Sequence, residues 1–423
     1  LEAITFRMRG HEEASGVKYV PPELFAEWAK KDPVENFGRY LQAEGVLSDK
    51  TVEGIKKRLK ERIEAAWEVV FAEPDLTAEV GAEVGDVYAI SIAKPIPPPT
   101  GPTHKKRFVD ALSDGLRQAM EHDPKLVIMG QDVAEYGGVF KVTEGFVEAF
   151  GKGRVRNTPL CESAILGASL GLSISGRASV VEMQFADFVA CGFNQIVNNL
   201  AKTHYRWQQP VNVTVRMPTG AGTAAGPFHS QSNEAWFTHV PGLKVVYPAT
   251  PFDAKGLIAS AVRDPNPVIF FEHKVLYRSI DGFVPDAPYT LPIGEARVAL
   301  EGTDATIVTY GAGVHWALDA ASKMDGKRIE VIDLRTLLPW DKERVFASVK
   351  KTSRCLVLHE DTLVGGFGGE IAAAIGEEMF EWLDAPVLRL GALETPVPFN
   401  SALEKQFLPK SRVTEKLRQL LAY

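Results

Sequence analysis

The sequence predicts an α/β protein with two doubly wound, mainly parallel sheets behind a helical N-terminal segment. Short apolar segments alternate with helical stretches over about residues 104–290, and the same alternation recurs over 291–423. Residues 1–92 carry helical periodicity instead. A proline-rich connector, residues 93–103, can continue neither a helix nor a central strand and marks the clearest boundary.

Composition limits the classes of function. The 423 residues are 45% hydrophobic, which is enough for two or three domains. A formal net charge of -7 argues against nucleic-acid or membrane partners, and no apolar run approaches the roughly 18 to 20 residues that span a bilayer. Cys161, Cys191 and Cys355 fit neither a zinc motif nor a disulfide framework, which favours a reducing interior. Because the chain opens at Leu1 within an apparent strand (LEAITFRMRG), we expect it to begin inside a longer polypeptide.

Two helices are expected in the N-terminal part. In KKDPVENFGRYLQAEG, Asp32 is a suitable N-cap, Pro33 occupies the first helical position and Gly45 suits the C-terminal stop. A second helix is expected over about 50–72, with a charged face and an apolar face that needs a partner surface. The apolar face comprises Val52, Ile55, Leu59, Ile63, Trp67 and Val70.

Eight apolar segments are the expected strands of the two sheets. The part over 104–290 contains KLVIMGQD, ASVVEMQF, VNVTVRMP, LKVVYPAT and PVIFFEH. The part over 291–423 contains ATIVTYG, RIEVIDL and CLVLHED, each followed by a helical stretch. Helices between strands predict parallel pairing with both sheet faces covered.

Two glycine-rich turns suggest a nucleotide site. TYGAGVHWAL follows a strand and opens a helix, as a dinucleotide-binding turn does, but Trp316 stands at the third glycine position, where an indole blocks close packing. VRMPTGAGTAAGPFHSQS lacks the Gly-Lys-Ser/Thr of a phosphate-binding loop. Tight turns explain both segments, and an NAD-dependent oxidoreductase stays open as an alternative class.

Glu162 is a single carboxylate at the head of the small-residue segment NTPLCESAILGASLGLSISG. The small residues behind it recur every three or four positions, so another backbone or a ligand can come close: Ala164, Gly167, Ala168, Gly171 and Ser175. A helix N-terminus favours a carboxylate, so a first-turn acid is the simpler interpretation of Glu162. A functional carboxylate is the alternative, since a charge entering an apolar segment must be paired, hydrated or used.

Four further side chains are candidates for a site. In VVEMQFADFVACGFNQIVNNLAK, Gln184 ends a strand and Phe188 opens a helix, where a core position is the simpler interpretation of the ring. His229, in GPFHSQSNEAW, ends a glycine-rich loop, and His11, in RMRGHEEASG, has a similar setting. Loop histidines are good catalytic candidates, although each is also compatible with a solvated surface position.

Taken together, four segments resemble one family: NTPLCESAILG, EMQFADFVACGFNQIVNNLAK, GPFHSQSNEAWFTHVPGLKVVYPATPFDAKGL and EVIDLRTLLPWD. The chain from about residue 104 to 423 resembles the beta subunit of the thiamine-diphosphate-dependent 2-oxo acid dehydrogenases, the decarboxylating first components of their complexes. The N-terminal part resembles the C-terminal end of the alpha subunit, so the chain is similar to an alpha–beta fusion. EMQFADF and YPATPFDAKGL are nearest to the branched-chain (2-oxoisovalerate) enzymes, with pyruvate and acetoin enzymes as alternatives. The resemblance implies a pyrimidine-binding α/β domain over 104–290 and a transketolase C-terminal-like domain over 291–423.

The resemblance also implies a role for each candidate residue. Glu162 would hydrogen-bond a ring nitrogen of the cofactor's aminopyrimidine, Phe188 would stack on that ring, and Gln184 would lie nearby. His229 would face the thiazolium side, where the substrate and the lipoyl group arrive. His11 would face the cofactor and substrate from the other side.

A structural monovalent cation, K+ in the first instance, is implied by the same resemblance. Its pattern maps onto the carbonyl of Val213, onto Ala261 and Val262, and onto Asp264 and Asn266 in SAVRDPNP.

The diphosphate anchor of the family is absent from the sequence. In the family, an alpha-subunit Gly-Asp-Gly followed by paired asparagines holds the diphosphate and its Mg2+, and this chain has no Gly-Asp-Gly. The asparagine pair in VNNLAK lies in the beta-type helix and is interpreted as unrelated. The chain is therefore expected to supply the pyrimidine half of a site, with a non-catalytic half-site as the competing interpretation.

The resemblance implies partners and a compartment as well. The implied partners are an alpha-subunit portion, a homodimeric or alpha2beta2-like assembly, and the lipoyl acyltransferase component. The third domain is expected to serve dimerisation and docking of that component. A bacterial cytoplasm is the expected compartment, with the mitochondrial matrix as the alternative.

Overall fold

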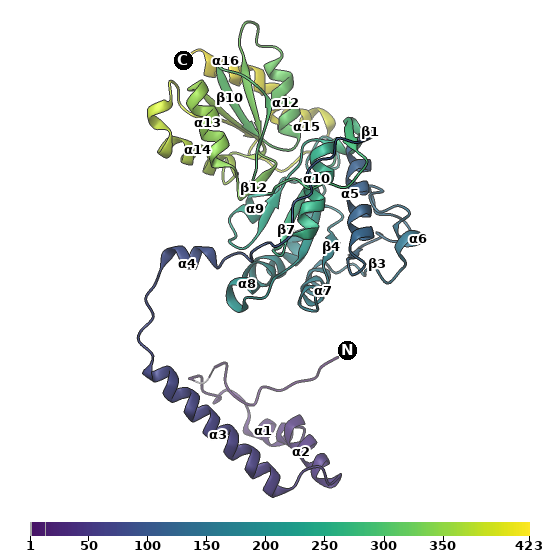
Figure 1. The fold of residues 1–423 in the computed structure, drawn as a ribbon, viewed down its shortest axis with the longest axis vertical. Helices are drawn as coiled ribbons and strands as arrows, with labels where there is room; N and C mark the ends of the chain where they lie inside the picture. The colour runs from purple at the N-terminus through teal and green to yellow at the C-terminus, as the bar shows by residue number, and fades with distance from the viewer. Residues whose placement is uncertain (1, 13) are drawn as a thin grey trace. The chain divides into compact units, whose positions relative to one another are not determined.

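The computed structural model describes residues 2–12 and 14–423, and the chain divides into two units, Leu1–Glu79 and Val80–Tyr423 (Figure 1). The helices of the first unit are α1 (Pro22–Ala29), α2 (Pro33–Ala43) and α3 (Asp49–Ala72). The predicted start of α2 is confirmed, because Asp32 Oδ1 accepts hydrogen bonds from the backbone N–H of Val34 and Glu35, at 2.8 and 3.2 Å. Gly45 follows α2 with φ +71°, which a glycine adopts without strain.

The strand expected at the start of the chain is wrong. Described residues 2–10 contain no strand, because no second strand of this unit lies in the described residues to complete a hydrogen-bonded ladder. The apolar face of α3 is exposed, as its sequence leads us to expect of a surface that needs a partner. Its exposed members include Leu59, Ile63, Trp67 and Val70.

An extended connector leads from α4 (Val80–Gly85) to β1 (Thr103–Arg107) along the surface of the second unit. Asn266 pairs its amide with both backbone groups of Ala89, accepting from the N–H at 2.7 Å and donating to the carbonyl at 3.0 Å. Further along, Thr290 Oγ1 accepts from the N–H of Ile96 at 2.8 Å. These backbone bonds fix an extended, proline-rich segment that has no secondary structure of its own.

The second unit confirms the predicted α/β class. Its larger sheet has the strand order β12-β6-β7-β5-β4-β2-β3, and every neighbouring pair is parallel except β12 with β6. The strands are β2 (Val127–Gly130), β3 (Val155–Asn157), β4 (Ser179–Glu182), β5 (Val213–Thr219), β6 (Lys244–Val246), β7 (Val268–His273) and β12 (Thr336–Leu338). All five segments predicted as strands in residues 104–290 are present. The sequence boundaries proposed at 93, 104 and 291 stay predictions.

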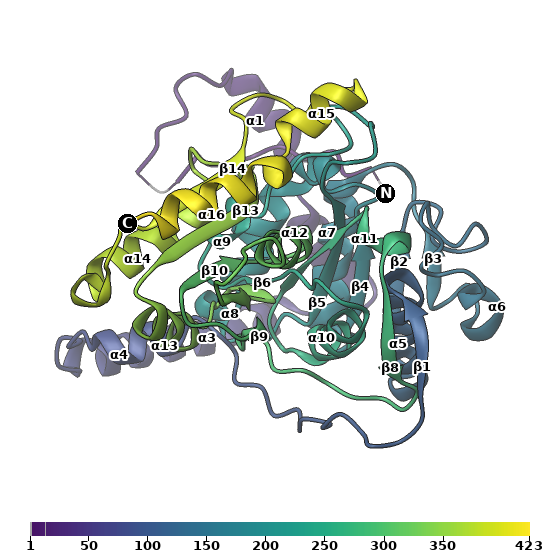
Figure 2. The same ribbon diagram turned by 90° about the horizontal axis from the view of Figure 1, so that it is seen from above.

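Helices cover both faces of this sheet (Figure 2). On one face lie α5 (Phe108–His122) and α10 (Pro251–Arg263), and on the other α7 (Glu162–Ile174) and α8 (Ala201–Trp207). Successive strand residues point to opposite faces. Accordingly Ile128, Val180 and Phe270 join the core beneath α5 and α10, whereas their neighbours Met129, Val181 and Ile269 join the core beneath α7.

The smaller sheet has the order β14-β13-β10-β11-β9, antiparallel only between β11 and β9. Its strands are β9 (Arg297–Leu300), β10 (Ala305–Thr309), β11 (Ile329–Asp333), β13 (Cys355–Thr362) and β14 (Leu388–Ala392). Helices α12 (Ala312–Ala321) and α16 (Val413–Leu421) contribute to one core, and α13 (Lys342–Thr352) and α14 (Gly368–Glu378) to the other. Strand β12, which lies after β11 in the chain, pairs with β6 of the larger sheet.

The turn between β10 and α12 needs its glycines for geometry. A Cβ on Gly313 would lie 2.2 Å from Thr309 Oγ1, and Trp316 is buried against the core. Close packing of the turn thus accounts for TYGAGVHW without a dinucleotide.

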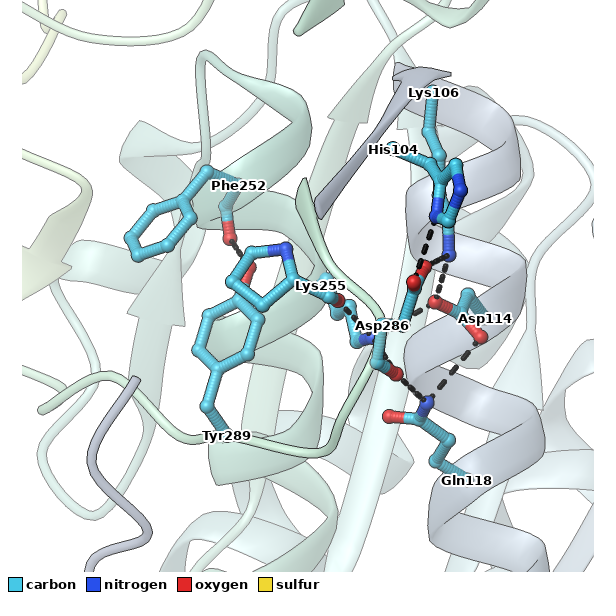
Figure 3. A network of polar contacts seen from close by, with 9 residues as sticks. His104, Lys106, Asp114, Gln118, Phe252, Lys255, Asp286 and Tyr289 are labelled. Atoms are coloured by element: carbon cyan, nitrogen blue, oxygen red, sulfur yellow. Dashed lines mark hydrogen bonds and ion pairs between the residues drawn. The ribbon is translucent and has the colours of Figure 1, made fainter. Parts of the chain in front are cut away.

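A buried lysine connects the two-stranded antiparallel sheet of β1 and β8 (Asp281–Pro285) to α5 and α10 (Figure 3). Lys255 Nζ donates to Asp114 Oδ2 at 2.8 Å and to the carbonyls of Pro285 and Asp286 at 2.7 and 3.0 Å. Lys106 Nζ reaches the same Asp114 oxygen at 2.6 Å. The Lys255 side chain is 1% exposed and that of Lys106 is 21% exposed, so the two ammonium groups differ mainly in burial.

We expect Lys255→Met to lower the free energy of unfolding by about 2–4 kcal/mol, because the buried Pro285 carbonyl loses its donor and Asp114 loses a buried cation. The matched change Lys106→Met should cost under about 1 kcal/mol, because its position is partly solvated. Urea denaturation of the two variants checks the difference. Equal losses would show that burial is not what makes Lys255 important.

Candidate active site

Polar side chains gather at the carboxyl ends of the central strands of the larger sheet. Gln131 and Asp132 follow β2, Gln184 follows β4, His229 lies in the loop after β5, and Lys274 follows β7. In open parallel sheets, ligands bind outside this edge, because the loops that carry functional groups converge there.

Glu162 is the first residue of α7 and is only 7% exposed. Gln131 Nε2 donates to Glu162 Oε1 at 3.0 Å, and no other side-chain partner of this carboxylate is found in the described residues. The short helix η1 (Ala186–Gly192) packs against the first turn of α7, since a Cβ on Gly192 would lie 3.3 Å from the backbone carbonyl carbon of Glu162. The second oxygen of Glu162, Oε2, has no side-chain partner among the described residues, so a ligand that reaches this carboxylate can supply a further hydrogen bond.

Gln184 belongs to the same polar group as Glu162. Its Nε2 donates to Asp132 Oδ2 at 3.3 Å, and Asp132 is the chain neighbour of Gln131. Asp132 has φ +57°, a conformation that non-glycine residues adopt rarely. One turn after β2 therefore supplies partners to both predicted polar residues.

The rings of Phe185, Phe188 and His229 form one cluster. The Phe185 centroid lies 5.5 Å from that of Phe188 and 4.8 Å from that of His229, and the Phe188 and His229 centroids are 5.5 Å apart. All three residues are half-buried. Phe188 is thus not a sealed core residue, and its ring remains partly accessible beside the imidazole.

A cavity of about 510 Å³ adjoins this cluster on the side of Phe185. It is lined by Phe140, Phe185, Gly222, Thr223, Lys274, Val275, Tyr277, Arg278 and Ser279. Burial lowers the pKa of Lys274 to about 8, although the nearby Glu360 carboxylate opposes that shift. Lys274 was not found from the sequence. The signal available was a lysine directly after the apolar strand PVIFFEH.

A buried cluster of charged side chains links β4, β5 and β7, the strands whose ends lead to the site. Arg216, in β5, bonds Glu182 of β4 at 2.5 Å and forms two bonds to Glu272 of β7, at 2.7 and 2.6 Å. All three side chains are at most 3% exposed. Tyr277 donates its hydroxyl to Glu272 at 2.6 Å. Charged residues inside otherwise apolar strands were the sequence signal for this cluster.

The residues predicted to hold a monovalent cation lie in β5, in α10 and just after α10. Asp264 Oδ1 accepts from both the backbone and side-chain N–H of Asn266, each at 2.9 Å, and its Oδ2 pairs with Lys244 at 2.5 Å. Val213 is in β5, and Ala261 and Val262 are in the last turn of α10. No group of three or more His, Cys, Asp or Glu side chains able to hold a metal occurs among the described residues. The cation site stays a prediction, since it rests largely on backbone carbonyls.

His11 lies in the first unit, on the segment before α1, and is exposed. Its role beside the cofactor stays a prediction. Among the described residues, no helix has the length and apolarity to cross a membrane.

The chain is similar to known proteins along nearly its whole length. Residues 104–279 match the pyrimidine binding domain of transketolase, and residues 294–413 match the transketolase C-terminal domain. The 2-oxoisovalerate dehydrogenase subunit beta of Bacillus subtilis is 45% identical over 324 residues, which cover 75% of this chain and 98% of that protein. The chain belongs to the beta-subunit family of thiamine-diphosphate-dependent 2-oxo acid dehydrogenases.

Other members of this dehydrogenase family are similarly close. A mitochondrial 2-oxoisovalerate dehydrogenase subunit beta 2 from Arabidopsis thaliana is 47% identical over 74% of this chain and 88% of its own length. The pyruvate dehydrogenase E1 component subunit beta of Bacillus subtilis is 42% identical over 75% and 98%. Residues 1–79 match the dehydrogenase E1 component, so this family member carries an alpha-type segment in front of its beta-type part.

The dehydrogenase fold is shared with transketolases. A solved structure, described as a split gene transketolase forming an inactive beta4 tetramer, superimposes with a TM-score of 0.62 at 25% identity, covering 75% of this chain and 98% of that one.

The residues present fit one half of thiamine diphosphate. A buried carboxylate short of partners at Glu162 and a half-exposed ring at Phe188 suit an aminopyrimidine, which offers ring nitrogens and an aromatic face. The sequence contains no Gly-Asp-Gly, and no group of three or more His, Cys, Asp or Glu side chains that could hold Mg2+ occurs in the part of the chain that the structure describes.

Proposed function

We propose that this chain is the beta-type part of a first component that decarboxylates a branched-chain 2-oxo acid of the 2-oxoisovalerate type and acylates a lipoyl group. The observation that carries the proposal is Glu162, a buried carboxylate with a single amide partner at the head of α7. Relatives named for 2-oxoisovalerate are 42–47% identical to this chain, and those named for pyruvate are 41–42% identical, which supports the branched-chain substrate.

When bound, thiamine diphosphate supplies a nucleophilic carbon for the 2-oxo group and an electron sink for the loss of carbon dioxide. In our proposal Glu162 exchanges a proton with a pyrimidine nitrogen, while Gln131 fixes the orientation of the carboxylate. A low-dielectric setting strengthens such a charged hydrogen bond. Phe188 offers its exposed face to the pyrimidine, and Gln184 is held nearby by Asp132.

His229 is the proposed proton-transfer group on the substrate side. Its ring is held edge-on to Phe185 and Phe188, and no side-chain hydrogen bond fixes it within the described residues. An imidazole has one ring nitrogen that donates and one that accepts, as proton transfer to and from a lipoyl sulfur requires. His11 is proposed to act from the alpha-type segment.

An alpha portion must complete the proposed site. We propose that it holds the diphosphate with Mg2+, in a homodimeric or alpha2beta2-like assembly that also binds the lipoyl acyltransferase component. K+ is proposed at the Val213, Ala261, Val262, Asp264 and Asn266 positions. A bacterial cytoplasm is the proposed compartment, in keeping with the bacterial relative, and the mitochondrial matrix is the alternative, in keeping with the mitochondrial relative.

Turnover of 2-oxoisovalerate and of pyruvate by the assembled enzyme, with an artificial electron acceptor, tests the proposal. We expect kcat/KM to favour 2-oxoisovalerate by about 10- to 200-fold, because the substrates differ by a small apolar side chain. A preference for pyruvate would support a pyruvate or acetoin enzyme instead. The chain assayed without an alpha portion is the control, and full turnover there would contradict the half-site interpretation.

A further inference from the structure

The loop that carries His229 is bound by a carboxylate from the other end of the chain. Glu404, in α15 (Ser401–Phe407), is 3% exposed. Its Oε1 accepts from the backbone N–H of Gly222 at 2.8 Å, and its Oε2 accepts from that of Ala224 at 2.9 Å. Both oxygens of one buried carboxylate thus fix the backbone of the glycine-rich segment. Bonds from backbone N–H to an ionised carboxylate are stronger than neutral ones.

A second buried carboxylate, that of Glu360, binds the same loop. Glu360, in β13, accepts from the backbone N–H of Ala221 at 2.6 Å and from the Ser232 hydroxyl at 3.4 Å through Oε1. Its Oε2 pairs with His273 Nε2 at 2.6 Å. Glu360, a residue of the smaller sheet, therefore connects the loop to the end of β7 in the larger sheet.

The segment bound by Glu404 and Glu360, residues 220–226, has several residues in left-handed backbone conformations. Gly220, Gly222 and Gly226 have φ of +91°, +101° and +75°, and Ala224 has φ +54°. A left-handed alanine costs about 1–2 kcal/mol, so the surroundings must stabilise it. A Cβ on Gly226 would lie 2.4 Å from the Phe399 ring, so the end of the segment is enclosed as well.

The far side of the loop is attached to the larger sheet's own domain. Asp187 Oδ1 accepts from the backbone and side-chain N–H of Gln231, at 3.2 and 2.9 Å. Asn233 Nδ2 donates to the carbonyl of Ala186 at 2.9 Å. His229 therefore lies between two fixed segments. Glu360 and Glu404 bind the segment before it, and η1 binds the segment after it. Helix η1 begins one residue after Phe185.

From this arrangement we infer that Glu404 and Glu360 are positioning residues that hold His229 against Phe185 and Phe188. The inference rests on the proposed function, because it takes His229 as the group that meets the substrate. It gives the C-terminal part of the chain a share in the site, through backbone hydrogen bonds and without contact with the substrate. When Glu404 is lost, two loop N–H groups lose their partner, the left-handed backbone relaxes, and the imidazole moves from the cluster.

The test is a double-mutant cycle of Glu404→Gln with His229→Ala in the assembled enzyme. A carboxamide accepts through one oxygen only and turns an NH2 toward the other N–H. We expect Glu404→Gln to lower kcat by about 10- to 100-fold with little change in KM, as for a misplaced catalytic group. In a His229→Ala background, the same change should alter kcat less than about twofold. Independent, multiplying effects would overturn the inference, because a purely structural role does not act through His229.

Hydrogen exchange provides a readout independent of turnover. In Glu404→Gln, amides of residues 220–226 should exchange at least about tenfold faster, while helix α16 is unaffected. Unchanged exchange would also overturn the inference. The matched control Glu415→Gln, at an exposed carboxylate in the first turn of α16, should change neither exchange nor kcat.

If Glu404→Gln fails to fold, Glu404→Asp keeps the charge but shortens the reach, and faster loop exchange is again expected. If His229→Ala keeps full activity, the proposed role of His229 fails, and the exchange result still decides whether Glu404 fixes the loop.

Discussion

Glu162→Gln should abolish most of the decarboxylation activity of the assembled enzyme, lowering kcat by about 10²- to 10⁴-fold, the range that a positioned proton-transfer group contributes. The side chain keeps its shape, and a carboxamide oxygen still accepts from Gln131. We therefore expect the free energy of unfolding to change by less than about 1 kcal/mol. Consumption of the 2-oxo acid and thermal denaturation, measured on the same preparation, separate the two effects.

The control for this prediction is another acid in the first turn of a helix. Glu370 occupies the first turn of α14 but is exposed, so Glu370→Gln removes the same helix-dipole interaction without touching the site. Its activity should stay within about twofold of the native value. If Glu162→Gln also kept near-native turnover, Glu162 would be a first-turn acid and the assignment of the site would fail.

Arg216→Met should lower the free energy of unfolding at pH 8 by about 3–5 kcal/mol, because it leaves Glu182 and Glu272 buried without their cation. Even in the native protein, burial raises the pKa of Glu182, against the opposing effect of Arg216. Removing the guanidinium takes away that opposing effect, so the pKa of Glu182 in the folded state rises further above the unfolded value of about 4.3.

The pH dependence of this loss follows from that direction. Below the unfolded pKa, the Glu182 carboxyl of the variant is protonated in both the folded and the unfolded state, so its contribution to the loss is small. As the pH rises toward the folded-state pKa, only the unfolded chain releases its protons freely, and the loss grows to its full size. Urea denaturation of both proteins at about pH 4 and pH 8 checks this. An equal loss at both values would contradict the role of charge.

A matched variant separates charge from packing. Arg216→Met combined with Glu182→Gln and Glu272→Gln removes all three charges at nearly constant volume. It should recover a large part of the stability at pH 8, because no buried ion remains unpaired. If the triple variant were as unstable as Arg216→Met, the shape of Arg216 rather than its charge would be what the fold needs.

Local patterns predicted most of the fold. The alternation of apolar segments predicted eight strands that the structure contains, and Asp32, Pro33 and Gly45 predicted the ends of α2. The strands β1, β3, β8, β9, β12 and β14 escaped prediction, because each is only partly buried or exposed and lacks the fully buried run of the central strands. Their pairing depends on partners far away in sequence, as β12 with β6 shows.

Some residues of the candidate site were predicted from the sequence and others were missed. Residue type and local setting singled out Glu162, Gln184 and His229, and the resemblance connected them. Gln131 and Lys274 were missed, because a glutamine or lysine at a strand end carries no signal until the neighbouring strands bring it to the same edge. Glu360 and Glu404 were missed for a stronger reason, since they lie 139 and 182 residues from the loop N–H groups of Ala221 and Gly222 that they bind.

The pairing of β12 with β6 has a consequence for folding. A strand that follows β11 in the chain closes the edge of the larger sheet, so the sheet is complete only after the chain has passed residue 338. During synthesis, β6 would remain an unpaired edge strand of the larger sheet until β12 has been made. The unpaired backbone groups of such an edge can associate with other chains. The chain beyond the predicted boundary near 291 therefore supplies a strand to the larger sheet as well as the strands of the smaller one, so the two sheets do not form in two independent folding events.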